Sequence, residues 1–62
     1  MKKYDVVVFY VELLIYLDGE ETSIYAVGSS TADCTDLVYA DIALLESLGH
    51  SVVVDEYRMG IL

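Results

Sequence analysis

The sequence has little cysteine, little histidine and few basic side chains, and it has no proline or tryptophan. One cysteine cannot close a disulfide within the chain, and one cysteine with one histidine cannot complete a structural zinc site. Three Lys and Arg against eleven Asp and Glu are too few to displace the counterions of a nucleic acid. The absence of proline, repeats and low-complexity stretches indicates a single small domain over residues 1–62.

An apolar run follows Lys2 and Lys3 and reaches Leu17, but it lacks the features of a membrane or secretory segment. Asp5 and Glu12 interrupt the run, and a charge near the middle of a spanning helix is costly. The run is shorter than the ~20 residues that a spanning helix needs. No cleavage site of small residues follows it. We therefore expect a soluble, cytoplasmic protein.

The chain is acidic and apolar at the same time. Its formal net charge is −8, yet 56% of its residues are hydrophobic and its mean hydropathy is +0.53. Disordered chains combine high charge with low hydrophobicity, so this composition favours a folded domain. A chain of this length buries only ~60% of its unfolded surface, so we expect marginal stability and a role for partners.

Alternation of side chains predicts a hairpin in the first half of the chain. Residues 5–17 are rich in Val, Ile, Leu, Phe and Tyr, which favour strands. Asp18-Gly19 is a strong hairpin-turn signal, and residues 22–28 form the return strand. The odd positions of the first strand are apolar and predict its core face. With the matching residues of the return strand, this face comprises Val7, Phe9, Val11, Leu13, Ile15, Leu17, Ile24 and Ala26.

A helix and a third strand are predicted for the second half. Ser29-Ser30-Thr31 supplies a helix N-cap, and the helix runs to about residue 48, before Gly49. Residues 51 to about 57 form a short Val-rich strand, and the tail 58–62 either extends it or docks elsewhere. The fold class is α+β, a ββαβ unit with a three-stranded sheet of order 2-1-3 and one helix packed on one face. The long apolar first strand takes the centre.

One helix leaves the other side of the sheet uncovered. Apolar patches of this size usually mark interaction surfaces, and Tyr gives large contact area at low entropic cost. The sequence predicts that this side binds a protein, with an ordinary solvated surface as the alternative. Its expected members are Val6, Val8, Tyr10, Leu14, Tyr16, Tyr25, Val27 and Val53. The outer strands also have free edges, so pairing of two edges is a second route to a dimer.

Few residues have the pattern of a catalytic or metal site. Cys34 and His50 are expected at opposite ends of the helix, so they do not form a dyad, and no catalytic, cofactor-binding or metal site is predicted. Asp41 is predicted to project into the apolar stripe of the helix, among Cys34, Leu37, Val38, Leu44, Leu45 and Leu48. It is interpreted as a buried structural Asp with a hydrogen-bond partner or as a residue at an interface edge.

The acidic residues are expected in two clusters at opposite ends of the sheet. One lies at the hairpin tip, and the other lies where the first strand and the helix begin. Such a surface presents the charge pattern of a nucleic-acid backbone and attracts a basic groove, although acids also keep small proteins soluble. The residues predicted to bind a partner by charge are Asp18, Glu20, Glu21, Asp33, Asp36, Asp55 and Glu56, and those predicted to bind it by packing are Tyr10, Tyr16 and Tyr25.

In size and charge the chain resembles small acidic phage-encoded inhibitors of the anti-CRISPR type, a likeness of overall character without a shared motif. The resemblance implies a non-enzymatic inhibitor that acts by nucleic-acid mimicry in the host cytoplasm and occupies the basic nucleic-acid-binding surface of a target protein. The alternative is a structural homodimerisation module that pairs through its Tyr-rich sheet face. A weaker third interpretation is an antitoxin-like or ligand-sensing domain. No direct contact with nucleic acid or membrane and no cofactor is expected.

Overall fold

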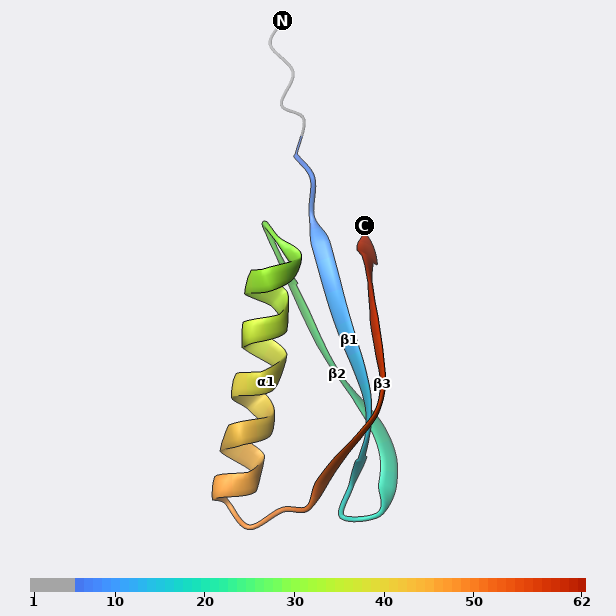
Figure 1. Cartoon of the computed structure of the whole chain (residues 1–62), viewed down its shortest axis with the longest axis vertical. Coiled ribbons are helices and arrows are strands. Elements are labelled where there is room, and N and C mark those ends of the chain that lie inside the picture. Colours follow the sequence, from blue (N-terminus) through green and yellow to red (C-terminus); the bar gives the residue numbers. More distant parts are fainter. Residues whose placement is uncertain (1–5) are drawn as a thin grey trace, which may run out of the picture.

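The chain folds as a three-stranded antiparallel sheet with one helix lying along one side of it (Figure 1). The computed structural model describes residues 6–62. Its elements are β1 (Phe9–Leu17), β2 (Glu20–Gly28), α1 (Thr31–Ser47) and β3 (Val52–Ile61). The strand order is β2-β1-β3, and β1 is antiparallel to both neighbours. The α+β class, the ββαβ order and the central position of β1 are therefore confirmed.

A two-residue turn joins β1 to β2. Asp18 and Gly19 both have positive φ angles, 51° and 86°, as the favoured two-residue hairpin turn requires. The turn fixes the register, so Leu17 lies opposite Glu20 and Leu13 opposite Ile24. Ile24 consequently shares the core face of β1, as the alternation predicted.

The core lies between the odd-numbered side chains of β1 and one stripe of α1. Its fully or almost fully buried members are Val11, Leu13, Ile15, Cys34, Val38 and Ile42. Each large aliphatic side chain buried in this way stabilises the fold by roughly 1.5–3 kcal/mol. Phe9, Leu17, Ile24, Ala26 and Val52 pack around them and are partly buried. The prediction was wrong for Val7, which is 52% exposed because β1 begins only at Phe9, beyond the helix.

The bounds of α1 follow the predicted caps. Ser30 is the N-cap, and its hydroxyl accepts a hydrogen bond from the Asp33 amide at 3.1 Å. Leu48 is the C-cap, and Gly49 follows it with a φ of 92°, a conformation that favours glycine.

The predicted apolar stripe of α1 was right for Cys34, Val38 and Leu45 and wrong for its other members. Asp41 is exposed, as are Leu37, Leu44 and Leu48, whereas Ile42 is buried. The observed stripe of Cys34, Val38, Ile42 and the half-buried Leu45 follows the helical repeat equally well. The sequence interpretation included Leu37, Leu44 and Leu48 in the stripe because they are large and apolar, but they lie beside the contact with the sheet. Asp41 therefore has no buried structural role.

β3 is longer than predicted because the tail continues the strand to Ile61. Leu62 extends the ladder further, since its amide donates to the Val8 carbonyl at 2.8 Å. The register of β3 against β1 shifts between Leu14 and Ile15, where Asp55 is an extra residue that forms a β-bulge. The predicted start of the first strand at Asp5 lies outside the described residues.

Candidate protein-binding face

The side of the sheet that faces away from α1 is called the open face here, and its members follow from the strand register. The even-numbered residues of β1 point to it, because successive side chains of a strand alternate. β2 and β3 add the residues that pair with these even-numbered residues of β1. β3 also adds Asp55, the extra residue of the bulge. The open face comprises Tyr10, Glu12, Leu14, Tyr16, Glu21, Ser23, Tyr25, Val27, Val53, Asp55, Glu56, Arg58 and Gly60.

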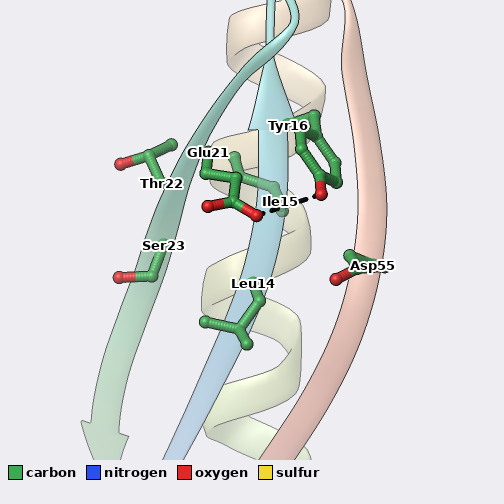
Figure 2. A pocket seen from close by; sticks show the side chains of 7 residues that line it. All are labelled: Leu14, Ile15, Tyr16, Glu21, Thr22, Ser23 and Asp55. Atoms are coloured by element: carbon green, nitrogen blue, oxygen red, sulfur yellow. Dashed lines mark hydrogen bonds between the residues drawn. The ribbon is translucent and has the colours of Figure 1, made fainter.

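The β-bulge gives the open face two consecutive acids from β3. In a regular strand Asp55 and Glu56 would point to opposite sides of the sheet. Here Glu56 lies opposite Leu14 on the open face, while the extra residue Asp55 lines a pocket on the same face (Figure 2). The bulge thus brings Asp55 toward Tyr16 and Glu21.

This pocket is a shallow hollow of about 320 Å3 with an acidic rim. Figure 2 shows Tyr16 and Glu21 in front of the sheet, joined by a hydrogen bond from the Tyr16 hydroxyl to Glu21 Oε1 of 3.0 Å. That hydrogen bond and the negative charges of Glu21 and Asp55 raise the pKa of Tyr16 above its ordinary value of 10.0. The phenol therefore stays neutral and holds Glu21 over the hollow. The full lining is Leu14, Ile15, Tyr16, Glu21, Thr22, Ser23 and Asp55.

Arg58 bridges two acids in the middle of the open face. Its guanidinium forms an ion pair with Glu56, and its Nη1 lies 3.9 Å from Glu12 Oε1. Glu56 raises the pKa of Arg58 by accepting a hydrogen bond from it and by its charge. Glu12 and Arg58 were not among the predicted site residues. Their positions in register, directly opposite each other on β1 and β3, are the signal that would have identified them once β3 is known to continue to Ile61.

Aromatic side chains dominate the end of the open face where β1 begins and β3 ends. The rings of Tyr10 and Tyr25 stack with centroids 5.8 Å apart and planes 21° apart. Tyr10 also lies over Gly60, where a Cβ would come within 2.7 Å of its ring. Tyr25 remains 52% exposed and Val27 46% exposed. The three predicted packing residues Tyr10, Tyr16 and Tyr25 therefore all lie on one face, at opposite ends of it.

The three acids predicted at the hairpin tip, Asp18, Glu20 and Glu21, do not form one charged cluster. Asp18 is tied to the start of β3, since its carboxylate accepts from the Ser51 amide at 2.8 Å and lies 2.7 Å from His50 Nδ1. These hydrogen bonds, that of Ser51 first, lower the pKa of Asp18 below its ordinary value of 3.8. Asp18 therefore stabilises the turn, whereas Glu20 is exposed beside it and Glu21 belongs to the open face.

The remaining predicted charges lie elsewhere. Asp33 and Asp36 are exposed on the first turns of α1, on the other side of the sheet from the open face. Asp33 also accepts a hydrogen bond from the Ser29 hydroxyl at 3.3 Å. The sequence interpretation expected the third strand to bring Asp55 and Glu56 closer to this end of the sheet. Because β3 continues to Ile61, these two acids instead lie near the middle of the strand.

The reactive or metal-binding side chains outside the open face, Cys34 and His50, lie far from each other. Cys34 is fully buried in the core, where its thiol lies 3.5 Å from the Phe9 carbonyl oxygen. His50 lies beyond the other end of α1 and contacts Asp18. Among residues 6–62, no three Cys, His, Asp or Glu side chains are grouped as metal ligands.

Comparisons with known proteins do not assign a family: no protein family, no curated protein and no solved structure matches this chain. Within the described part of the chain, no helix is both long enough and apolar enough to cross a membrane.

Proposed function

We propose that the protein is a non-enzymatic inhibitor whose open face occupies a basic, nucleic-acid-binding surface of a target protein. The observation that carries this proposal is the β-bulge, because it lets both Asp55 and Glu56, rather than one of them, lie on the face that holds Tyr16 and Glu21. Carboxylates and phenols then form one continuous surface. This role matches that of the small acidic inhibitors of the anti-CRISPR type, which the chain resembles in size and charge.

The two kinds of side chain make different contributions. The acids attract a basic groove over a distance and raise the rate of association. The exposed ring of Tyr25 and the half-buried ring of Tyr10 stacked on it then fill apolar recesses of the target, since a few aromatic side chains usually supply most of the affinity of an interface. Tyr16 and Glu21 enter the contact as a preformed pair, so little freedom is lost when they bind.

A homodimer that pairs two open faces has less support. A two-fold axis through the hollow would bring the acidic rim around Glu21 and Asp55 against the rim of a second copy, and like charges opposite each other are destabilising. A foreign surface rich in Lys and Arg has no such conflict. The same acids that weaken the homodimer thus favour a basic partner.

The test is capture of proteins from candidate host cells on the immobilised full chain, followed by binding measurements with each purified nucleic-acid-binding protein recovered. The variant E21Q/D55N removes one Glu and one Asp from the open face while leaving an amide oxygen to accept from Tyr16. The matched control D36N/E46Q removes one Asp and one Glu from α1. We expect E21Q/D55N to weaken binding roughly 10-fold, which is about 1.4 kcal/mol, and D36N/E46Q to change it little.

Two further results would follow from the same interaction. Added nucleic acid displaces the inhibitor from its target, and affinity falls as salt rises from ~0.05 to ~0.3 M, because screening weakens the attraction. Equal effects of the two variants, or an affinity that salt does not change, would refute the role of the open-face acids. A captured target that binds the inhibitor and nucleic acid at the same time would refute the inhibitory mechanism.

A further inference from the structure

The outer part of β3 is an exposed apolar row that the helix does not cover. α1 packs mainly against β1 and β2, and Figure 1 shows β3 on the far side of β1 from the helix. On the helix side of the sheet, Tyr57 is 41% exposed, Met59 61% and Ile61 64%. Thr35 of α1 reaches only the first of these, through a hydrogen bond of 2.8 Å to the Tyr57 hydroxyl.

The backbone of the same residues is also free to pair. Leu62 and Val8 are hydrogen-bonded across the sheet, so in the alternating antiparallel pattern Gly60 and Arg58 turn their amides toward β1. Tyr57, Met59 and Ile61 therefore point their N–H and C=O groups outward. Within the described residues 6–62, no strand lies beyond β3 in the sheet. This edge is thus a template for one more antiparallel strand.

The charges of this segment are unlike those of the rest of the chain. Residues 57–62 contain Arg58 and no Asp or Glu, in a protein with a net charge of −8. A basic partner would find no Asp or Glu side chain to bind in this segment. A second copy of this acidic chain can approach the same segment without repulsion, because no Asp or Glu lies in it.

We propose that β3 pairs with β3 of a second copy in an antiparallel, two-fold symmetric arrangement centred on Met59. Tyr57 then lies opposite Ile61 of the second copy, and Met59 lies opposite its own equivalent. About six backbone hydrogen bonds form between the outward-facing groups. The result is a six-stranded sheet in which the apolar row of each copy covers that of the other between the two helices.

The side chains on the open face are compatible with this register. Arg58 of the second copy comes opposite Gly60, beside the ring of Tyr10 that lies over Gly60, where a guanidinium is attracted to the aromatic face. A register centred on Arg58 would place two like charges opposite each other. A register centred on Tyr57 would bring Met59 opposite Asp55, where the bulge interrupts the edge.

The antiparallel arrangement also separates the acidic ends of the two copies. With Met59 at the centre, Asp55 and its equivalent are eight strand residues apart, or ~26 Å at ~3.3 Å per residue. This is well beyond the Debye length of ~8 Å at physiological salt. The repulsion that weakens a face-to-face dimer is therefore small here, and salt strengthens this dimer, opposite to its expected effect on binding of a basic target.

The test is the oligomeric state of the full chain by analytical ultracentrifugation over a range of concentrations and salt, for wild type, M59E and L44E. Met59 and Leu44 are exposed to almost the same extent, 61% and 59%, so the two variants add the same charge at matched sites on β3 and α1. We expect a wild-type dimer, at least ~10-fold weaker dimerisation in M59E, and no change in L44E. A weak dimer has a dissociation constant of up to ~100 μM. A wild-type chain that is still monomeric at ~100 μM would overturn the proposal, as would equal effects of M59E and L44E.

Isotope-filtered NMR on a mixture of labelled and unlabelled wild-type chains tests the register without any variant. Nuclear Overhauser contacts between Tyr57 of one copy and Ile61 of the other are expected. Contacts between copies that involve Tyr16 and Tyr25 and exclude Tyr57 would overturn the edge arrangement. Because neither measurement involves a target protein, failure here leaves the proposed inhibitor role unaffected.

Discussion

At the scale of single residues, Asp18 connects the hairpin turn to the start of the third strand. The residue adopts a positive φ, which Asp and Asn tolerate better than most residues. Its carboxylate accepts from the Ser51 amide and contacts His50, thirty-two positions along the chain. Asp18-Gly19 in the sequence predicts only a local turn, whereas in the structure Asp18 also links this turn to the residues that precede β3.

The lowered pKa of Asp18 gives this contact a measurable pH dependence. A carboxylate whose folded-state pKa lies below its ordinary value of 3.8 stabilises the fold above that value, and the contribution is lost as pH falls through the folded-state pKa. D18N keeps the tolerance for positive φ but has no charge to lose. We expect D18N to be less stable than wild type at neutral pH and the two to converge in acid below pH 3.8. Urea unfolding at several pH values measures this, and a difference that stays constant down to the lowest pH would contradict it.

At the scale of elements, alternation and turn chemistry predicted three strands, and the apolar first strand predicted their order, but neither the start of β2 at Glu20 nor the end of β3 at Ile61 was predicted. Asp18-Gly19 predicted the hairpin, and the apolar odd positions of β1 identified the core. The bulge at Asp55 could not be predicted, because nothing in the local pattern of 52–57 distinguishes a regular strand from one with an extra residue. That single residue decides which acids share the open face, so the candidate site was predicted less well than the fold.

The helix shows a second limit of periodicity. Two overlapping stripes of α1 are apolar, one through Val38 and Ile42 and one through Leu37 and Leu44. The larger leucines favoured the second stripe, but a narrow sheet of three strands accommodates only one. The choice depends on how the side chains fit against β1, which is a property of the tertiary contact and not of the helix sequence.

This orientation predicts the effect of conservative substitutions in α1. I42V should lower the free energy of unfolding by about 1 kcal/mol, since it removes a buried methylene. L44A and D41N, at exposed positions, should each change it by less than about 0.5 kcal/mol. Thermal or urea unfolding of the three variants measures this. If D41N destabilised the protein more than I42V, the helix would be turned as the sequence interpretation had it.

At the scale of the whole molecule, negative charge is distributed unevenly over an acidic protein. Glu21 and Asp55 line the same hollow as Tyr16, and the negative charge of each acid raises the pKa of Tyr16. Asp41 and Glu46 on α1, in contrast, have no acid three or four residues away, where side chains of a helix are neighbours. Net charge alone therefore does not describe the repulsion within the folded chain, because close pairs contribute more than distant ones.

The dependence of stability on salt should reveal this distribution. Raising ionic strength from ~0.01 to ~0.15 M shortens the Debye length from ~30 to ~8 Å and relieves repulsion between acids. We expect the free energy of unfolding of wild type to rise with salt in urea titrations. E21Q/D55N should rise less steeply than D41N/E46Q, although each variant removes one Asp and one Glu, because Glu21 and Asp55 line the same hollow, whereas Asp41 and Glu46 have no acid three or four residues away on α1. Parallel slopes in the two variants would mean that repulsion follows total charge, and the open face would then have no concentrated negative potential with which to attract a basic target.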